Sequence, residues 1–201
     1  MKWPSLRAKC RFMFPTRPLI LVSKSPRRRQ LLQEAGFTFR VEALEVDESF
    51  SADMPVESVA EHLALRKARA ARHLIQEDEI LLSADSVVIR EGRIYNKPQS
   101  YEEAFDMLRA LSGQRHTVIT GVCLLSTEKE RSFSDRSEVF FEPLGDEEID
   151  FYIRRYRPFD KAGAYGVQEW IGLCKISRIE GSYANVMGLP VHRVYAELKA
   201  F

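Results

Sequence analysis

The feature that most constrains the fold is a short apolar run that leads directly into a helix start. Residues 19–22 read Leu-Ile-Leu-Val, which is typical of a buried strand. Ser25 and Pro26 follow: serine suits the N-cap, and proline suits the first helical position, where its missing N–H costs nothing. Apolar residues at helical spacing continue to Gly36, a typical helix stop. The segment therefore predicts a strand followed at once by a helix.

Strand and helix patterns alternate along the rest of the chain. Residues 55–74 carry apolar side chains at helical spacing, and residues 80–89 resemble a buried strand interrupted at 83–86. The other expected elements are a strand within 37–46, a hairpin to 93–95, strands near 116–125 and 132–141, and helices over 100–111, 146–156 and 191–198. A glycine- and aromatic-rich stretch fills 161–188. This order favours an α/β fold around a mixed sheet.

Composition and charge exclude several classes of protein. The chain has 201 residues, of which 45% are hydrophobic and 29% charged, as expected for one globular domain. A net charge of +1 argues against a general nucleic-acid binder or a membrane-surface binder. No apolar run approaches the roughly 20 residues that span a bilayer. We therefore expect neither nucleic acid nor membrane as a partner.

The cysteines and the N-terminal segment indicate the cellular setting. Cys10, Cys123 and Cys174 are odd in number and far apart, and neither they nor the histidines show metal-ligand spacing. A reduced compartment is the simplest home for such a chain, so we expect a cytoplasmic protein. Residues 1–17 are basic and aromatic but lack the apolar core and cleavage site of a signal peptide. We expect them to form an N-terminal extension, with one domain over 18–201.

Three arginines occupy the first turn of the first expected helix. A helix start carries partial positive charge, so each arginine of residues 27–29 should cost about a few tenths of a kcal/mol there. The arrangement is explained if a phosphate is held at that start by backbone N–H groups and guanidinium groups. The alternative is a solvated basic turn. No Gly-x-x-x-x-Gly-Lys-Ser/Thr loop is present, which argues against a P-loop phosphotransferase.

Two charged residues interrupt apolar patterns. Lys67 lies on the apolar side of its expected helix, and Asp85 lies inside an apolar strand pattern. Burying either charge alone is expensive, so Lys67 must reach the edge of the protein or meet an anion. Asp85 needs a cation or a metal unless it is a turn residue at a strand break. Both positions are therefore candidates for a functional site.

Other polar residues become informative only in combination. Glu48 in an acidic loop and Lys97 after a hairpin are ordinarily surface groups. Together, four cations can neutralise a triphosphate: Arg27, Arg28, Lys67 and Lys97. Glu48 and Asp85 can supply the hard oxygen ligands that Mg²⁺ prefers. Gln168 is either an ordinary loop amide or, because it offers a donor and an acceptor in one plane, a reader of a pyrimidine edge.

Six segments of the chain resemble the Maf family of nucleotide pyrophosphatases, in order and at similar spacing over about residues 18–198. They are 23–32 (SKSPRRRQLL), 84–88 (ADSVV), 96–98 (NKP), 111–113 (LSG), 160–168 (DKAGAYGVQ) and 180–190 (EGSYANVMGLP). The resemblance implies two lobes on an elongated mixed sheet with a cleft between them, a fold similar to inosine triphosphate pyrophosphatases. It implies a cytoplasmic enzyme that converts nucleoside triphosphates to monophosphate and pyrophosphate with Mg²⁺ or Mn²⁺. The family also allows a homodimer.

The resemblance also implies roles for individual residues. The family's catalytic carboxylate, which accepts a proton from the attacking water, corresponds to Asp85, and its metal ligands correspond to Glu48 and Asp85. Its phosphate-binding groups correspond to Ser23, Arg27, Arg28, Lys67 and Lys97. Substrate choice is associated with Arg27, Ser86 and Gln168. The Gly-Ala-Tyr-Gly-x-Gln form is that of the dTTP/UTP branch, whose groups also fit modified pyrimidine nucleotides.

The chain departs from the family pattern at three places. Lys24 replaces a small residue, Ser86 replaces threonine, and Glu169-Trp170 replaces a glycine-led sequence. These departures bear on base preference more than on reaction type. The alternative function is a nucleotide-binding regulator of cell division or septum formation without significant turnover, which needs the phosphate-binding cations but not the carboxylates.

Overall fold

A computed structural model describes residues 17–201, so the expected extension over residues 1–17 lies outside the described residues except for Arg17. The strands are β1 (Leu19–Val22), β2 (Phe39–Glu42), β3 (Ile80–Arg90), β4 (Arg93–Tyr95), β5 (Arg115–Leu125), β6 (Glu130–Phe141) and β7 (Ile176–Glu180). The α-helices are α2 (Pro26–Glu34), α3 (Val56–Ala70), α4 (Tyr101–Leu111), α5 (Asp146–Tyr156), α6 (Trp170–Cys174), α7 (Tyr183–Met187) and α8 (Val191–Ala200). Short 3₁₀ turns cover Arg72–Leu74, Pro158–Asp160 and Ala162–Ala164.

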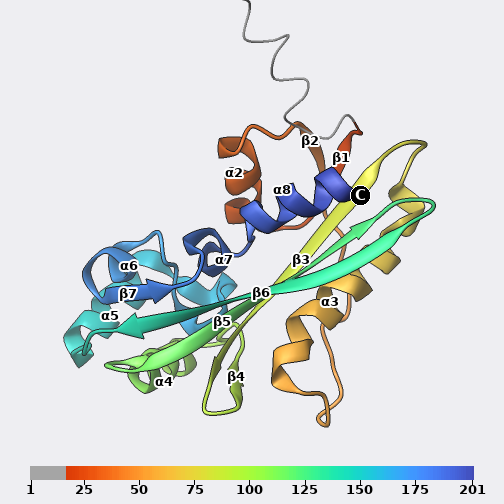
Figure 1. Cartoon of the computed structure of the whole chain (residues 1–201). Coiled ribbons are helices and arrows are strands. Elements are labelled where there is room, and N and C mark those ends of the chain that lie inside the picture. Colours follow the sequence, from red (N-terminus) through yellow and green to blue (C-terminus); the bar gives the residue numbers. More distant parts are fainter. Residues whose placement is uncertain (1–16) are drawn as a thin grey trace, which may run out of the picture.

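One mixed sheet organises these elements, with strand order β2-β1-β3-β5-β6-β7 and β4 beside β3. β1 runs parallel to β2 and β3, and the other pairs are antiparallel. The long strands β3, β5 and β6 connect α2 and α8 near one end of the molecule to α4, α5 and α6 at the other (Figure 1). The predicted α/β class with a mixed, elongated sheet is confirmed.

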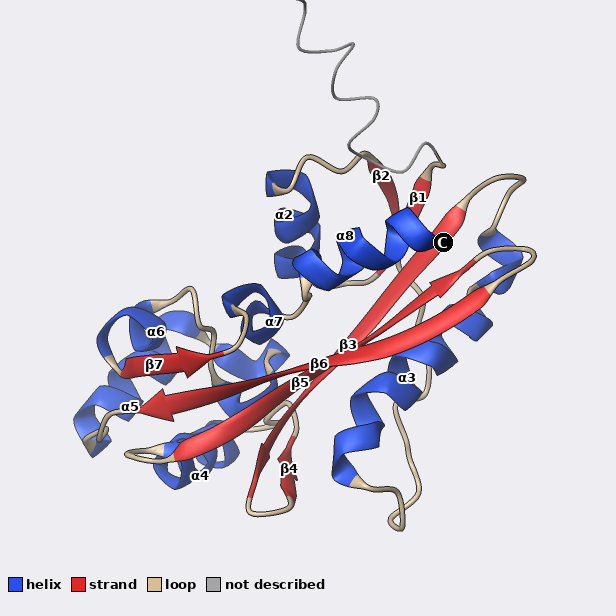
Figure 2. Cartoon of the chain, viewed as in Figure 1, coloured by secondary structure: helices blue, strands red, loops and turns tan. Residues whose placement is uncertain are grey.

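Helix α3 covers one face of the sheet, and most other helices pack on the opposite face. Ala64 and Ala68 of α3 pack with Leu81 and Cys123, on one face of β3 and β5. The main core lies across the sheet and includes apolar residues of α2, α4, α5 and α8. The loop from β2 to α3 runs beside α3 (Figure 2), and Arg66 of the helix donates to the carbonyl of Ser49 in that loop. This contact brings the acidic loop close to the sheet.

The close approach of α3 depends on one glycine. A Cβ at Gly121 of β5 would lie 2.3 Å from the backbone of Ala60 in α3. No side chain fits at that distance, so the absence of a Cβ lets the helix backbone rest directly on the strand. Asp85 of β3 is paired with Gly121 in register. The glycine therefore brings α3, which carries Lys67, close to Asp85.

Strand β3 has an edge that is only partly paired. Residues 80–83 pair with β1 and residues 88–90 pair with β4 on the same edge. Among residues 17–201, residues 84–87 therefore have no strand neighbour there. Because side chains alternate across a sheet, Asp85 faces α3 and Ser86 faces the opposite side. The predicted interruption at 83–86 is wrong, since β3 is continuous from Ile80 to Arg90. Its polar residues mark this unpaired edge instead of a break.

Other expected boundaries also change. β2 covers only residues 39–42 of the expected 37–46, because its single neighbour β1 is four residues long. Helix α3 ends at Ala70, and the expected final turn is a 3₁₀ turn. The stretch 161–188 contains α6, β7 and α7, each of five residues and too short to show periodicity in sequence.

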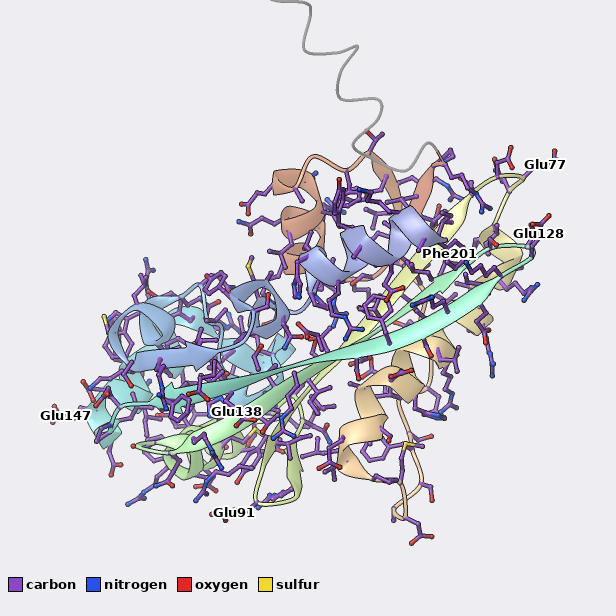
Figure 3. The ribbon with its side chains drawn as sticks, in the orientation of Figure 1. Glu77, Glu91, Glu128, Glu138, Glu147 and Phe201 are labelled. Carbon is purple, nitrogen blue, oxygen red and sulfur yellow. The ribbon has the colours of Figure 1, made fainter. Side chains whose placement is uncertain are left out.

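Several acidic side chains lie on separate parts of the surface. Glu77, Glu91, Glu128 and Glu147 lie exposed on turns and helix starts well apart from one another (Figure 3). Within residues 17–201, no helix combines the length and the apolar character needed to cross a membrane.

Candidate functional site

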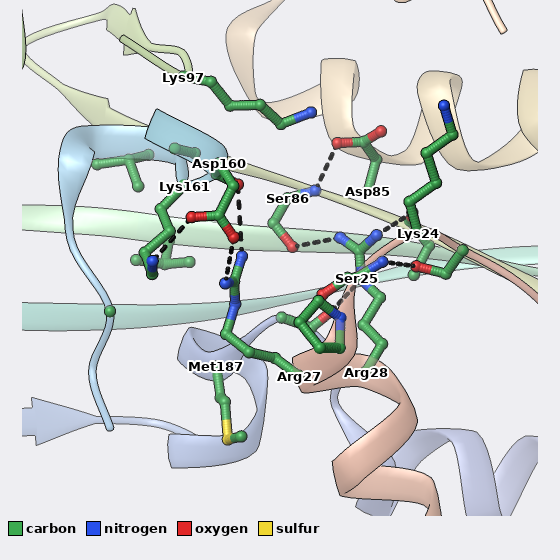
Figure 4. A pocket seen from close by; sticks show the side chains of 18 of the residues that line it. Lys24, Ser25, Arg27, Arg28, Asp85, Ser86, Lys97, Asp160, Lys161 and Met187 are labelled. Atoms are coloured by element: carbon green, nitrogen blue, oxygen red, sulfur yellow. Dashed lines mark hydrogen bonds and ion pairs between the residues drawn. The ribbon is translucent and has the colours of Figure 1, made fainter. Parts of the chain in front are cut away.

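A cleft of about 560 Å³ opens at the unpaired edge of β3. Its walls come from the loop before α2, the loop before α3, the turn after β4, the 160–168 segment and the end of α7 (Figure 4). All nine residues singled out from the sequence line it. They are Ser23, Arg27, Arg28, Glu48, Lys67, Asp85, Ser86, Lys97 and Gln168. The fold therefore brings together side chains that are separated by up to 145 positions, from Ser23 to Gln168.

Lys67 lies between two carboxylates. Its Nζ is 2.7 Å from Glu48 Oε1 and also contacts Asp85 Oδ2. The Lys67 and Asp85 side chains are only 16% and 11% exposed, so water screens this pair weakly. Lys97 Nζ adds a second ammonium 3.2 Å from Glu48 Oε2. Of the two outcomes expected for an inward-facing Lys67, the structure shows contact with an anion.

The two lysines favour the ionised form of Glu48. Burial raises the pKa of Glu48, but the hydrogen bonds and charges of Lys67 and Lys97 outweigh that effect and hold the pKa below its ordinary value. The neighbouring cations of α3 point elsewhere, because Arg66 pairs with Asp47 and Arg69 pairs with Glu130. Lys67 is therefore the α3 cation that serves the cleft.

The start of α2 contributes a second group of cations. Ser25 occupies the N-cap position, but its side chain makes no capping hydrogen bond, while Ser23 Oγ accepts from the Ser25 N–H at 3.1 Å. Arg27 Nη1 donates to Asp160 Oδ2 at 2.8 Å across the cleft (Figure 4). Burial raises the pKa of Asp160, but Lys161 and Arg27 hold it below its ordinary value. Arg27, which was predicted to bind a phosphate, is thus paired with the Asp160 carboxylate in this structure.

Arg28 is bound inside the protein by three different groups. Its Nε donates to Gly188 O at 2.7 Å, Nη1 to Ala84 O at 2.8 Å and Nη2 to Ser86 Oγ at 3.0 Å. A guanidinium has five N–H donors, so two remain for a ligand. The Ala84 carbonyl belongs to the unpaired edge of β3. Its hydrogen bond from Arg28 replaces the one that a neighbouring strand would supply.

A chain of hydroxyl groups continues from Arg28 beneath the cleft. Thr120 Oγ1 donates to Asn185 O at 3.0 Å, and Ser86 Oγ lies 2.9 Å from Thr120 Oγ1. Since the single hydroxyl proton of Thr120 goes to Asn185, the Ser86 hydroxyl must donate to Thr120. Ser86 therefore has no proton left for a substrate and offers only a lone pair. Neither Thr120 nor Asn185 was singled out from the sequence, where no spacing sets Thr120 apart.

Gln168 carries an unpartnered polar atom. Its Oε1 is buried and accepts no hydrogen bond from residues 17–201. Buried acceptors are nearly always paired, so an unpaired one in a cleft indicates the place of a ligand donor. Asp160 and Lys161 line the same region. They belong to the quoted 160–168 segment, but no role was assigned to them from the sequence.

The chain is similar to known proteins over most of its length. The sequence model of the Maf-like protein family matches residues 18–201. A dTTP/UTP pyrophosphatase of Porphyromonas gingivalis is 50% identical over 91% of this chain and 94% of its own length. A dTTP/UTP pyrophosphatase of Bacteroides thetaiotaomicron is 47% identical over 90% of this chain and 94% of its own length. Among solved structures, the Staphylococcus aureus Ham1 protein is similar at a TM-score of 0.45 and 14% identity, over 62% of this chain and 71% of that protein.

Proposed function

This chain belongs to the family of Maf-like proteins, and on that basis we propose that it hydrolyses dTTP and UTP to the monophosphate and pyrophosphate. Modified pyrimidine nucleoside triphosphates belong to the same substrate class. The observation that carries the proposal is the contact of the inward-facing Lys67 with both Glu48 and Asp85. Relatives at this level of identity that are named as pyrophosphatases favour a hydrolase over a nucleotide-binding regulator of cell division.

The proposed reaction is in-line attack of water on the α-phosphorus with pyrophosphate as the leaving group. Asp85 accepts the proton of the water, because it is the carboxylate directly at the unpaired edge of β3. Negative charge grows on the phosphoryl oxygens during attack, so catalysis depends mainly on placed cations. Arg27, Arg28, Lys67 and Lys97 supply those cations, and Ser23 offers its hydroxyl to a phosphate oxygen.

Entry of the triphosphate exchanges ion-pair partners. The phosphate oxygens draw Lys67 and Lys97 away from Glu48, and they draw Arg27 away from Asp160. Until the substrate binds, the carboxylates of Glu48 and Asp160 pair with the cations that would later bind phosphate. This exchange keeps the cations in place without leaving them unpaired in the free enzyme.

The carboxylates fit a divalent metal, Mg²⁺ or Mn²⁺. Glu48 and Asp85 already direct one oxygen each at a single cation, the Lys67 ammonium. Within residues 17–201 no three His, Cys, Asp or Glu side chains gather as a metal site, so phosphate oxygens and water would complete the coordination. When bound, the metal supplies charge neutralisation at the phosphates.

We assign substrate choice to Gln168, together with Arg27 and Ser86, which line the same cleft. The buried Gln168 Oε1 suits the N3–H of uracil or thymine, and the amide N–H₂ suits O4. Ser86 acts indirectly, since it holds Arg28 and offers no proton of its own. The pyrimidine preference therefore depends on a single amide.

We place the activity in the domain over residues 18–201, with residues 1–17 as an extension. Cys123 and Cys174 form no disulfide with each other within residues 17–201, and we propose a cytoplasmic location. We assign the protein a nucleotide substrate without a nucleic-acid partner, and the family allows a homodimer. Gel filtration with light scattering measures the oligomeric state.

The test is a hydrolysis assay with a panel of nucleoside triphosphates and Mg²⁺, with pyrophosphate and orthophosphate measured separately. We expect dTTP and UTP to yield the monophosphate and pyrophosphate, with turnover abolished by a chelator and restored by Mg²⁺ or Mn²⁺. Orthophosphate as the first product would contradict cleavage at the α-phosphorus. Equal binding of dTTP with and without chelator, combined with no product, would support the regulator instead.

A further inference from the structure

The segment that carries Gln168 is tied to one buried hydroxyl. Tyr152 of α5 is fully buried, and its Oη accepts a hydrogen bond of 2.9 Å from the Gly166 N–H. The same Oη also contacts Glu169 Oε2. Gly166 and Glu169 are joined by a turn, in which the Glu169 N–H donates to Gly166 O at 3.0 Å. Gln168 lies inside this turn, so one tyrosine hydroxyl holds both of its ends.

The direction of these hydrogen bonds follows from counting protons. The Gly166 N–H can only donate, so the tyrosine oxygen accepts there, and its single proton goes to Glu169. Burial and the neighbouring Glu169 carboxylate raise the pKa of Tyr152 far above its ordinary value, so the hydroxyl keeps that proton. Glu169 must then be an acceptor, and the Lys161 ammonium lies 3.2 Å from its other oxygen.

The Glu169 carboxylate also fills the space under the turn. A Cβ at Gly166 would lie 2.8 Å from the Glu169 carboxyl carbon. The turn and the carboxylate are therefore packed against each other, and a shift of either would move Gln168. Lys161 extends the connection, because its Nζ is also 2.7 Å from Asp160 Oδ1 and Asp160 pairs with Arg27.

We propose that Tyr152 and Glu169 are positioning residues that set the discrimination between keto pyrimidines and cytosine. Uracil and thymine present an N3–H donor beside the O4 acceptor, whereas cytosine presents an acceptor beside an amino donor. A Gln168 amide that is free to move or flip can hydrogen-bond with both patterns. An amide held in one place can hydrogen-bond with only one of them. The inference rests on the proposed function, since it assigns how the same site selects its base.

The test is Tyr152→Phe, which keeps the ring and removes only the hydroxyl. kcat and KM are measured for UTP and CTP, and dissociation constants are measured for UMP and CMP by calorimetry. We expect the preference for UTP over CTP in kcat/KM to fall about tenfold, with the UMP:CMP affinity ratio falling in parallel and kcat for UTP within about threefold of wild type.

Tyr156→Phe is the matched control, because Tyr156 is on the same helix and its ring stacks on Tyr152 at 5.0 Å. It should leave both ratios unchanged. Glu169→Gln is the second variant: it keeps the side-chain size and an acceptor for Tyr152 but loses the charge facing Lys161, so a smaller fall in the same ratios is expected. It also decides the question if Tyr152→Phe does not fold.

Equal losses for uridine and cytidine compounds, or unchanged ratios in both variants, would overturn the inference. Failure of the proposed function gives a different result, because wild-type protein would then release no pyrophosphate from any nucleotide. The UMP and CMP affinities still decide the positioning role in that case.

Discussion

The two ends of the cleft are built from different kinds of interaction. The end proposed to bind phosphate, called the phosphate end, consists of Glu48, Lys67, Asp85 and Lys97. Its charged side chains meet one another as ion pairs, and Glu48 is 44% exposed. At the base end, which is the turn 166–169 with Tyr152, a buried hydroxyl and a packed carboxylate hold a short piece of backbone. Ion pairs hold the first end together, whereas hydrogen bonds and packing fix the backbone of the second.

This difference has a functional consequence. Ion pairs between flexible side chains can exchange partners, so under the proposed function the phosphate end would release its cations to an incoming triphosphate. A buried hydrogen bond to a backbone N–H cannot be exchanged without leaving an unpaired group. We therefore expect changes at the phosphate end to alter rate for every substrate, and changes at the base end to alter which substrate is used.

The largest effect is expected for Asp85→Asn. Removal of the proposed proton acceptor should lower kcat by about 10²–10⁴-fold for dTTP and UTP alike, while the fold is retained because Asn keeps the acceptor for the Ser86 N–H. Steady-state kinetics and a thermal melt measure both. Asp53→Asn, at an exposed aspartate, is the control. Wild-type rates in Asp85→Asn would remove this residue from the mechanism.

Gly121→Ala tests whether the phosphate end depends on position as well as charge. The added Cβ would meet the α3 backbone at 2.3 Å, so α3 must move away from β5 and carry Lys67 with it. We expect a loss of about 3 kcal/mol in the free energy of unfolding, measured by urea titration. Gly145→Ala, whose Cβ meets only Glu148 at 3.7 Å, should cost clearly less. Equal losses in the two variants would contradict the close approach.

Lys67→Met isolates the charge at the phosphate end. It leaves Glu48 and Asp85 without their shared cation. We expect the free energy of unfolding at pH 7 to fall by about 2 kcal/mol, a value discounted for the partial exposure of the pair. The folded-state pKa of Glu48 is lowered, so its stabilising effect is complete above the ordinary value near 4.5 and is lost as pH falls through the folded-state value.

The difference between wild type and Lys67→Met should therefore shrink below pH 4.5, in urea titrations at pH 7 and pH 4. Arg66→Met, which removes the cation of a more exposed pair, should show a much smaller difference at both values. A difference that grows on acidification would contradict the assignment.

The smallest effect is expected for Thr120→Val, under the cleft and between its two ends. The change removes one of the two donors to Asn185 O, which keeps the Gly188 N–H, and it frees the Ser86 proton, at a cost of about 1 kcal/mol in stability. KM should change more than kcat, because Arg28 is held less firmly. Thr120→Ser retains the hydroxyl and should restore both values. Failure of serine to restore KM would rule out the hydroxyl chain as the cause.

Local sequence patterns were sufficient for most regular elements and for the charged residues of the cleft. The helix over Asp146–Tyr156 and the strand Leu19–Val22 agree with their predicted bounds, because their patterns are continuous. Lys67 and Asp85 were identified because each places a charge in an apolar pattern, which requires a partner wherever the chain folds. Their mutual contact agrees with that requirement.

The tertiary structure alone decided what holds these residues in place. Tyr152 and Thr120 appear in sequence as an ordinary core tyrosine and a strand threonine. Their importance comes from partners on other elements: Tyr152 bonds Gly166 and Glu169, and Thr120 bonds Ser86 and Asn185. A periodic pattern records which side of an element is buried. It does not record which distant donor meets which acceptor, because that depends on how the elements pack together.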